Sequence, residues 1–291
     1  MRARYPDCDA IVARDGVEIR YERYGQGRLA ILLLPAWSLV HSRYWKMQIP
    51  YLARHFTVVC FDGRGSGGSD RPADASAYSD AVFASDALAV MDAAGIGSAV
   101  LVSVSRGALW ALRLCAEHPD RVLGAVFIAP TARLMPPLAE RRVERFDEVI
   151  DDPVGWQTYN AHYWKTHYPE FVAFFVRRIF TEPHSTKQVE DATGWALETD
   201  GETLTAADRG IERCDAAATR RLAARLACPV LVIHGTDDAV RGGWPANPRT
   251  SSPRPAGTTC TASRRCAGWT RSWWPTSWCS RRSSRRAATT W

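Results

Sequence analysis

Short apolar runs recur at intervals along the first 240 residues of the chain. Runs of four to seven mostly apolar residues, typical of strands buried on both faces of a sheet, occupy residues 29–34, 56–61, 98–104, 122–128 and 230–233. Ahead of them, residues 11–24 carry Asp15-Gly16 near their centre, a dipeptide that favours the tight turn of a β-hairpin. All of these segments are predicted strands.

Helical spacing fills the intervals between the runs. Four apolar residues fall at i, i+3, i+4 and i+7 within residues 81–94, which predicts a helix with one apolar side. A second helix is predicted over residues 107–118, where Pro119 stops it. Strands that alternate with helices predict an α/β fold, with a doubly wound and mostly parallel sheet covered by helices on both faces.

Residues 134–220 break this alternation. They read as helical, contain no clear strand and are rich in large aromatic side chains, among them Phe146, Trp156, Tyr159, Tyr163, Trp164, Phe171, Phe174, Phe175, Phe180 and Trp195. This stretch predicts a helical cap over the sheet. The predicted organisation is a core over residues 1–133, the cap over 134–220, the last recognisable core strand and its turn over 221–241, and an aberrant tail over 242–291.

The segment Ser103-Val104-Ser105-Arg106-Gly107 joins a predicted strand directly to a predicted helix. A turn this tight strains the backbone of its central residue and exposes that side chain. The residues two before and two after it must be small where strand and helix cross, and Ser103 and Gly107 meet this demand. The pattern therefore predicts that Ser105 is a nucleophile near the positive end of the following helix.

Two further loops follow predicted strands. Residues 61–72 are dense in glycine, but they lack the Lys-Ser/Thr of a P-loop and the spacing of a dinucleotide-binding loop, so nucleotide binding is not predicted. The strand at 230–233 leads into His234-Gly235-Thr236-Asp237-Asp238. A carboxylate at the end of a strand can orient a catalytic imidazole and stabilise its charged form.

Taken in order, these motifs resemble the α/β-hydrolase superfamily, in the branch with esterases, lactonases and cofactor-free haloperoxidase-like hydrolases. The resemblance covers residues 11–241 and implies the α/β-hydrolase fold with its helical cap. The matching motifs are Pro35-Ala36-Trp37, D-x-R-G-x-G-x-S at 62–69, S-x-S-x-G at 103–107, Glu117-His118-Pro119-Asp120-Arg121-Val122 and His234-Gly235-x-x-Asp238.

The resemblance also implies roles for single residues. Ser105 matches the nucleophile and Asp238 the triad acid, whereas Asp237 stands one residue too early for that position. The backbone N–H groups of Trp37 and Arg106 match the two donors of the oxyanion hole. Pro35-Ala36 stands where the family has His-Gly, so the loop before Trp37 departs from the family pattern.

A serine nucleophile argues against haloalkane dehalogenase and epoxide hydrolase chemistry, which this superfamily runs through a carboxylate ester. Hydrolysis of an ester, thioester, lactone or carbon–carbon bond remains. The expected function is a serine hydrolase for a small or medium apolar ester, lactone or related acyl compound, because the cap aromatics favour an apolar pocket. Such aromatics also serve plain packing. No cofactor and no metal are expected.

The sequence contains no histidine at the position where the resembled family has the general base of its catalytic triad. In the resembled family the catalytic histidine follows the acid, and no histidine follows His234. His234 itself is interpreted as structural. The other histidines are His41, His55, His118, His162, His167 and His184. We expect negligible hydrolase activity from the chain as it stands. A non-catalytic, ligand-binding member of the same fold is the alternative.

The tail over residues 242–291 has an unusual composition. It contains no Leu, Ile, Val, Phe, Met or Tyr, yet holds nine arginines and six of the twelve tryptophans. This resembles GC-rich DNA read in a wrong frame. Moving each codon back by one base permits Gly-Trp-Asp-His-Leu-His over 256–261 and an apolar segment over 268–279. A frameshift near residues 239–243 is our hypothesis, and resequencing codons 236–245 tests it.

The tail also accounts for the basic charge of the chain. The whole chain carries a net charge of +6, but residues 1–241 hold 28 basic and 31 acidic residues, a net charge of −3. Nucleic-acid or membrane binding is therefore not predicted for the body, although an Arg/Trp tail could contact either one. The expected partner is a small-molecule substrate, with homo-oligomerisation left open.

Location and cysteine chemistry complete these expectations. The N-terminal residues carry charges throughout, and no apolar run approaches the ~18 residues of a membrane-spanning helix, so a cytoplasmic protein is expected. The eight cysteines include no C-x-x-C pair, which argues against zinc and thioredoxin-like sites. They are interpreted as small buried hydrophobic residues in a reducing compartment.

Overall fold

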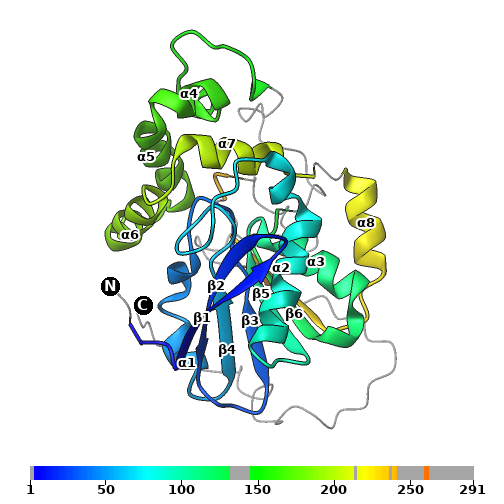
Figure 1. The fold of residues 1–291 in the computed structure, drawn as a ribbon. Helices are drawn as coiled ribbons and strands as arrows, with labels where there is room; N and C mark the ends of the chain where they lie inside the picture. Colours follow the sequence, from blue (N-terminus) through cyan, green and yellow to red (C-terminus); the bar gives the residue numbers. More distant parts are fainter. Residues whose placement is uncertain (1–2, 132–144, 213–214, 236–237, 241–258, 262–291) are drawn as a thin grey trace, which may run out of the picture.

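The computed structural model describes residues 3–131, 145–212, 215–235, 238–240 and 259–261 (Figure 1). Its centre is an eight-stranded sheet in the order β1-β2-β4-β3-β5-β6-β7-β8. The strands are β1 (Cys8–Arg14), β2 (Val17–Tyr24), β3 (Ala30–Leu33), β4 (Thr57–Phe61), β5 (Ala99–Val104), β6 (Val122–Ile128), β7 (Val230–His234) and β8 (Thr259–Thr261).

The five neighbouring strands from β4 to β7 run parallel, and antiparallel pairs flank them on both sides. Each predicted buried strand is present, with its ends within one residue of the expected positions. The predicted hairpin is also confirmed, because Asp15 (φ 52°) and Gly16 (φ 75°) both adopt the left-handed conformation of a two-residue turn between β1 and β2. The mostly parallel α/β sheet is therefore confirmed.

Helices cover both faces of the sheet. On one face lie α2 (Asp80–Ala93), α3 (Gly107–Glu117) and α8 (Ala216–Ala224), with the largest apolar core between them and the strands (Figure 1). The other face carries η1 (Ser42–Trp45) and α1 (Ile49–Leu52) over a smaller core. Strand periodicity divides the two cores: in β3, Leu32 faces the first, whereas Ile31 and Leu33 face the second.

Residues 145–212 form a second, mostly helical layer at one end of the sheet, at the top of Figure 1. It comprises η5 (Gly155–Thr158), α4 (Ala161–Thr166), α5 (Tyr168–Ile179), α6 (Thr186–Ala196) and α7 (Gly201–Arg209). Buried aromatic side chains make its separate core, chiefly Phe146, Trp156, Tyr159, Trp164, Phe171 and Phe175. We call this layer the cap. The predicted boundary at residue 220 falls inside α8, which packs against α3 of the core.

Short elements complete the described chain: η2 (Ala75–Tyr78) before α2, and η3 (Pro119–Arg121) before β6. In the predicted irregular tail, residues 259–261 form β8, which pairs antiparallel with β7, and the rest of 242–291 lies outside the described residues. Within the described part of the chain, no helix is both long and apolar enough to cross a membrane. The cytoplasmic location stays a prediction.

Candidate active site

The carboxyl ends of three neighbouring strands bring the predicted site residues to one edge of the sheet. Val104 of β5 pairs with Ile128 of β6, which pairs with Ile233 of β7. Ser105 directly follows Val104, and His234 directly follows Ile233. Because β6 lies between β5 and β7, the backbones of Ser105 and His234 are two strand spacings apart, roughly 10 Å. The loop after β3 belongs to the same edge, because β3 runs parallel to its neighbour β5.

The elbow at Ser105 has the strained geometry that its sequence predicts. Ser105 lies between β5 and α3 with a φ of 51°, which a non-glycine residue rarely adopts. Gly107 is small for a physical reason: a Cβ atom there would lie 2.2 Å from the Pro35 carbonyl oxygen. Ser103 is fully buried and donates its hydroxyl to the Val126 carbonyl at 3.1 Å. The strand and the helix therefore cross in close contact.

Backbone hydrogen bonds hold Ser105 against the end of β6. Its N–H donates to the Ile128 carbonyl at 2.9 Å, and its own carbonyl accepts from the Thr131 N–H at 2.9 Å. The two hydroxyl oxygens, Ser105 Oγ and Thr131 Oγ1, are 3.3 Å apart. The buried Thr131 was missed from the sequence. Its place after a strand predicted to end at residue 128 was the only available signal.

Arg106 turns its side chain away from the elbow. Its guanidinium donates to Asp80 Oδ1 at 3.0 Å, and the Trp110 indole Nε1 donates to the same oxygen at 2.8 Å. All three groups are buried. This buried ion pair holds the first turn of α3 against the start of α2, directly behind Ser105. Nothing in the sequence pattern singled out Asp80.

Trp37 lies between the loop after β3 and the cap. Its backbone forms an isolated β-bridge with Val40, whose N–H donates to the Trp37 carbonyl at 3.2 Å. Its indole stacks on Tyr159 with ring centroids 5.9 Å apart and packs edge-on to Phe175 at 5.5 Å. Because this loop begins at Pro35, which contacts Gly107, Trp37 lies on a segment braced against the elbow. Its role as an oxyanion donor stays a prediction.

Asp238 lies in the turn after β7, as predicted from its motif. Its Oδ1 accepts from the Val240 N–H at 2.8 Å, and its Oδ2 lies 3.1 Å from His234 Nε2. The sequence suggested a structural role for the buried His234, and the structure places it beside the predicted triad acid. Asp237, the alternative acid, lies outside the described residues.

His41 is buried where the loop after β3 meets the cap. Its Nε2 lies 3.3 Å from Glu198 Oε2, and its ring packs at 5.7 Å against Trp195. Burial lowers the pKa of His41, although the carboxylates of Asp62 and Glu198 act in the opposite direction. None of the hydrogen bonds or ion pairs of the described histidines reaches the Ser105 hydroxyl. Ser105 and Asp238 follow β5 and β7 at the same edge of the sheet, and their roles as nucleophile and acid stay predictions.

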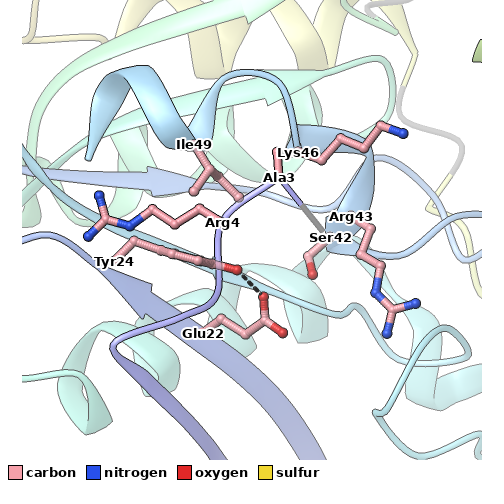
Figure 2. Close-up of a pocket in the computed structure, with 8 residues that line it drawn as sticks. All are labelled: Ala3, Arg4, Glu22, Tyr24, Ser42, Arg43, Lys46 and Ile49. Atoms are coloured by element: carbon pink, nitrogen blue, oxygen red, sulfur yellow. Dashed lines mark hydrogen bonds between the residues drawn. The ribbon is translucent and has the colours of Figure 1, made fainter. Parts of the chain in front are cut away.

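One small cavity opens on the surface near the N-terminus, away from all the predicted site residues (Figure 2). Its lining includes Glu22 and Tyr24, whose hydroxyl donates to Glu22 Oε2 at 2.5 Å. Its volume of about 10 Å³ holds roughly one water molecule, so it is no substrate pocket. Within the described ranges, no three His, Cys, Asp or Glu side chains gather as a metal site.

Comparison with known proteins places this geometry among hydrolases. A family model described as alpha/beta hydrolase fold matches residues 30–241. A fluoroacetate dehalogenase of Burkholderia sp is 38% identical over 31% of the chain and 32% of its own length, and 3-oxoadipate enol-lactonase 2 of Acinetobacter baylyi is 29% identical over 43% and 45%. The matches therefore span less than half of these relatives. A thermophilic esterase structure from Thermogutta terrifontis has a TM-score of 0.63 at 25% identity, covering 81% of this chain and 82% of the esterase.

Proposed function

Because the chain belongs to the alpha/beta hydrolase fold family, we propose that it is built as a serine hydrolase with Ser105 as its nucleophile. The substrate class is a small or medium apolar ester, lactone or related acyl compound. The observation that carries the proposal is the backbone of Ser105, whose φ of 51° lies at the turn from β5 to α3. Strained residues of this kind persist only where the surrounding structure imposes them, and they gather at active sites.

The proposed chemistry follows from the groups around the elbow. Ser105 Oγ adds to the acyl carbon, and the backbone N–H groups of Trp37 and Arg106 stabilise the negative charge that develops on the carbonyl oxygen. The Thr131 hydroxyl, 3.3 Å from Ser105 Oγ, restricts the rotamer of the nucleophile. Asp238 orients the base that takes the serine proton. In this chain that base is the missing component.

The substrate class is favoured by two observations. The aromatic side chains of the cap reach the Trp37 loop, so an acyl group bound beside the elbow meets apolar surface. An enol-lactonase and an esterase stand among the similar proteins. The short match to a fluoroacetate dehalogenase favours another reaction. In the resembled superfamily, dehalogenation needs a carboxylate nucleophile, and position 105 is a serine.

Covalent labelling with a fluorophosphonate probe tests the proposal. We compare the chain as it stands with a version in which the reading frame after residue 241 is restored. The restored chain is expected to label at Ser105, and Ser105→Ala to abolish the label. The chain as it stands is expected to label several orders of magnitude more slowly, because it lacks the general base. The matched control is Ser103→Ala, two residues away on β5, which retains labelling. Failure of the restored chain to label, or label that survives in Ser105→Ala, contradicts the proposal.

The second candidate is a ligand-binding protein without turnover. It is favoured by the absence of any histidine after Asp238 in the sequence. It is also favoured by the contact between Asp238 and His234, because this contact engages the Asp238 carboxylate that would otherwise orient a catalytic base. This candidate predicts that small apolar esters raise the melting temperature of the chain as it stands and are recovered intact. Turnover by the unrestored chain that is lost in Ser105→Ala contradicts it.

A further inference from the structure

The loop after β3 leaves one backbone donor unused. Trp37 lies in this loop, and within the described residues no hydrogen bond uses its backbone N–H as the donor. Its indole Nε1 is buried and has no hydrogen-bond partner in that part of the chain either. Because no polar contact fixes the indole, the neighbouring rings determine where it lies, and with it the backbone that carries it.

Three aromatic rings of the cap surround the Trp37 indole. Tyr159 stacks on it with an interplanar angle of 13° and ring centroids 5.9 Å apart. Phe175 packs edge-on at 5.5 Å, and Trp164 packs at a tilt at 6.2 Å. Aromatic pairs at these separations attract one another beyond the effect of the apolar area that they bury. Of the three rings, Tyr159 alone has a side-chain hydrogen bond among the described residues.

Asp208 on α7 accepts this hydrogen bond. The Tyr159 hydroxyl donates to Asp208 Oδ1, and both residues are buried. Because an unpaired buried hydroxyl costs free energy, a fixed acceptor restricts the orientation of the ring that carries it. Helix α7 packs against α4 of the cap and against η2 of the core, so Asp208 stands on an element that contacts both layers (Figure 1).

We propose that Asp208 is a positioning residue for the oxyanion hole, and that it acts through Tyr159 on Trp37. The inference rests on the proposed function, which assigns the Trp37 N–H to the developing oxyanion. The core holds the same loop from the other side, because the Ser38 hydroxyl donates to the Arg64 carbonyl at 2.8 Å. An oxyanion donor is effective only within about 3 Å of the developing charge, so even a small displacement of Trp37 lowers the rate.

Fluorine NMR of the full chain tests the positioning without requiring turnover. All tryptophans are replaced by 5-fluorotryptophan, and Trp37→Phe identifies the Trp37 resonance by its loss. Asp208→Ala removes the acceptor that Asp208 offers to the Tyr159 hydroxyl, and it is expected to shift the Trp37 resonance by more than its line width. The resonance of Trp110, in the main core, stays in place and shows that the fold is intact. Asp208→Asn keeps a carbonyl acceptor and is expected to restore the parent spectrum.

A double-mutant cycle shows whether Asp208 acts through Tyr159. Tyr159→Phe keeps the stacked ring, removes the donating hydroxyl and is expected to shift the Trp37 resonance as Asp208→Ala does. Adding Asp208→Ala to Tyr159→Phe is expected to cause no further shift. The matched control is Arg209→Gln, one residue farther along α7, where the guanidinium pairs with exposed Asp147 at 2.7 Å, and it leaves the resonance unchanged. A Trp37 resonance that Asp208→Ala does not move, or additive shifts in the double variant, overturns the proposal.

Labelling kinetics of the frame-restored chain test the consequence for the reaction. Varying the fluorophosphonate concentration separates the labelling rate at saturation from the concentration that gives half of that rate. Asp208→Ala is expected to lower the saturated rate about tenfold or more and to leave the half-saturating concentration within about threefold of the parent, whereas Asp208→Asn recovers most of the rate. An unchanged saturated rate in Asp208→Ala overturns the proposal. If the restored parent does not label at Ser105, the proposed function fails, and the fluorine spectra still decide whether Asp208 positions Trp37.

Discussion

Replacing Gly107 with alanine measures how tightly strand and helix cross at the elbow. Gly107 is the first residue of α3, where helix propensity alone favours alanine by about 0.5–1 kcal/mol. The structure predicts instead that alanine at position 107 destabilises the protein. The new Cβ would lie 2.2 Å from the Pro35 carbonyl oxygen, far inside the roughly 3.5 Å of good non-bonded packing.

The clash involves backbone atoms, so rotating a side chain does not relieve it. Overpacking of this kind costs about 1–3 kcal/mol, and the helix-propensity gain offsets only part of it. We expect Gly107→Ala to lower the free energy of unfolding by about 2 kcal/mol. It should also reduce labelling of Ser105 in the frame-restored chain, because relief of the clash displaces the loop that carries Trp37.

Urea unfolding followed by tryptophan fluorescence gives the magnitude, as a lower midpoint at unchanged slope. The matched control is Gly194→Ala in α6, where a new Cβ meets nothing within 4 Å. Its midpoint should rise, since only the propensity gain of about 0.5–1 kcal/mol remains. If Gly107→Ala is as stable as the parent while Gly194→Ala gains, the crossing is loose and the steric explanation of Gly107 is wrong.

Two further predictions concern buried charges. Asp80→Ala leaves the Arg106 guanidinium and the Trp110 indole without their shared acceptor, so the free energy of unfolding should fall by about 3–5 kcal/mol. Asp80→Asn should lower the free energy of unfolding by less. Equal urea midpoints for the parent and Asp80→Ala would refute this. Burial lowers the pKa of His41 below 6.5, so the unfolded chain binds this proton first and stability falls as the pH decreases from 6.5 through the folded pKa. His41→Gln should remove this part of the decline, seen as a flatter series of urea midpoints between about pH 7 and pH 5; parallel series would contradict the sign.

Local features of this protein were readable from its sequence. The buried strands and the elbow depend on neighbours within a few residues, because apolar runs, small residues and turn dipeptides restrict the backbone where they occur. Ser105 was predicted to occupy a strained turn and has a φ of 51°. The absence of a histidine after His234, from which we predicted that the general base is missing, can likewise be read from the sequence alone.

Contacts between distant segments were decided only by the tertiary structure. Thr131 meets the Ser105 hydroxyl because β6 pairs with β5 in one particular register, and Asp80 meets Arg106 because α2 packs beside α3. An apolar run indicates that a strand is buried, but it does not indicate which strand pairs with it or in which register. The hydrophobic effect favours burial of each apolar segment but does not specify which other segment it packs against. The strand order and the helix packing determine which side chains are in contact.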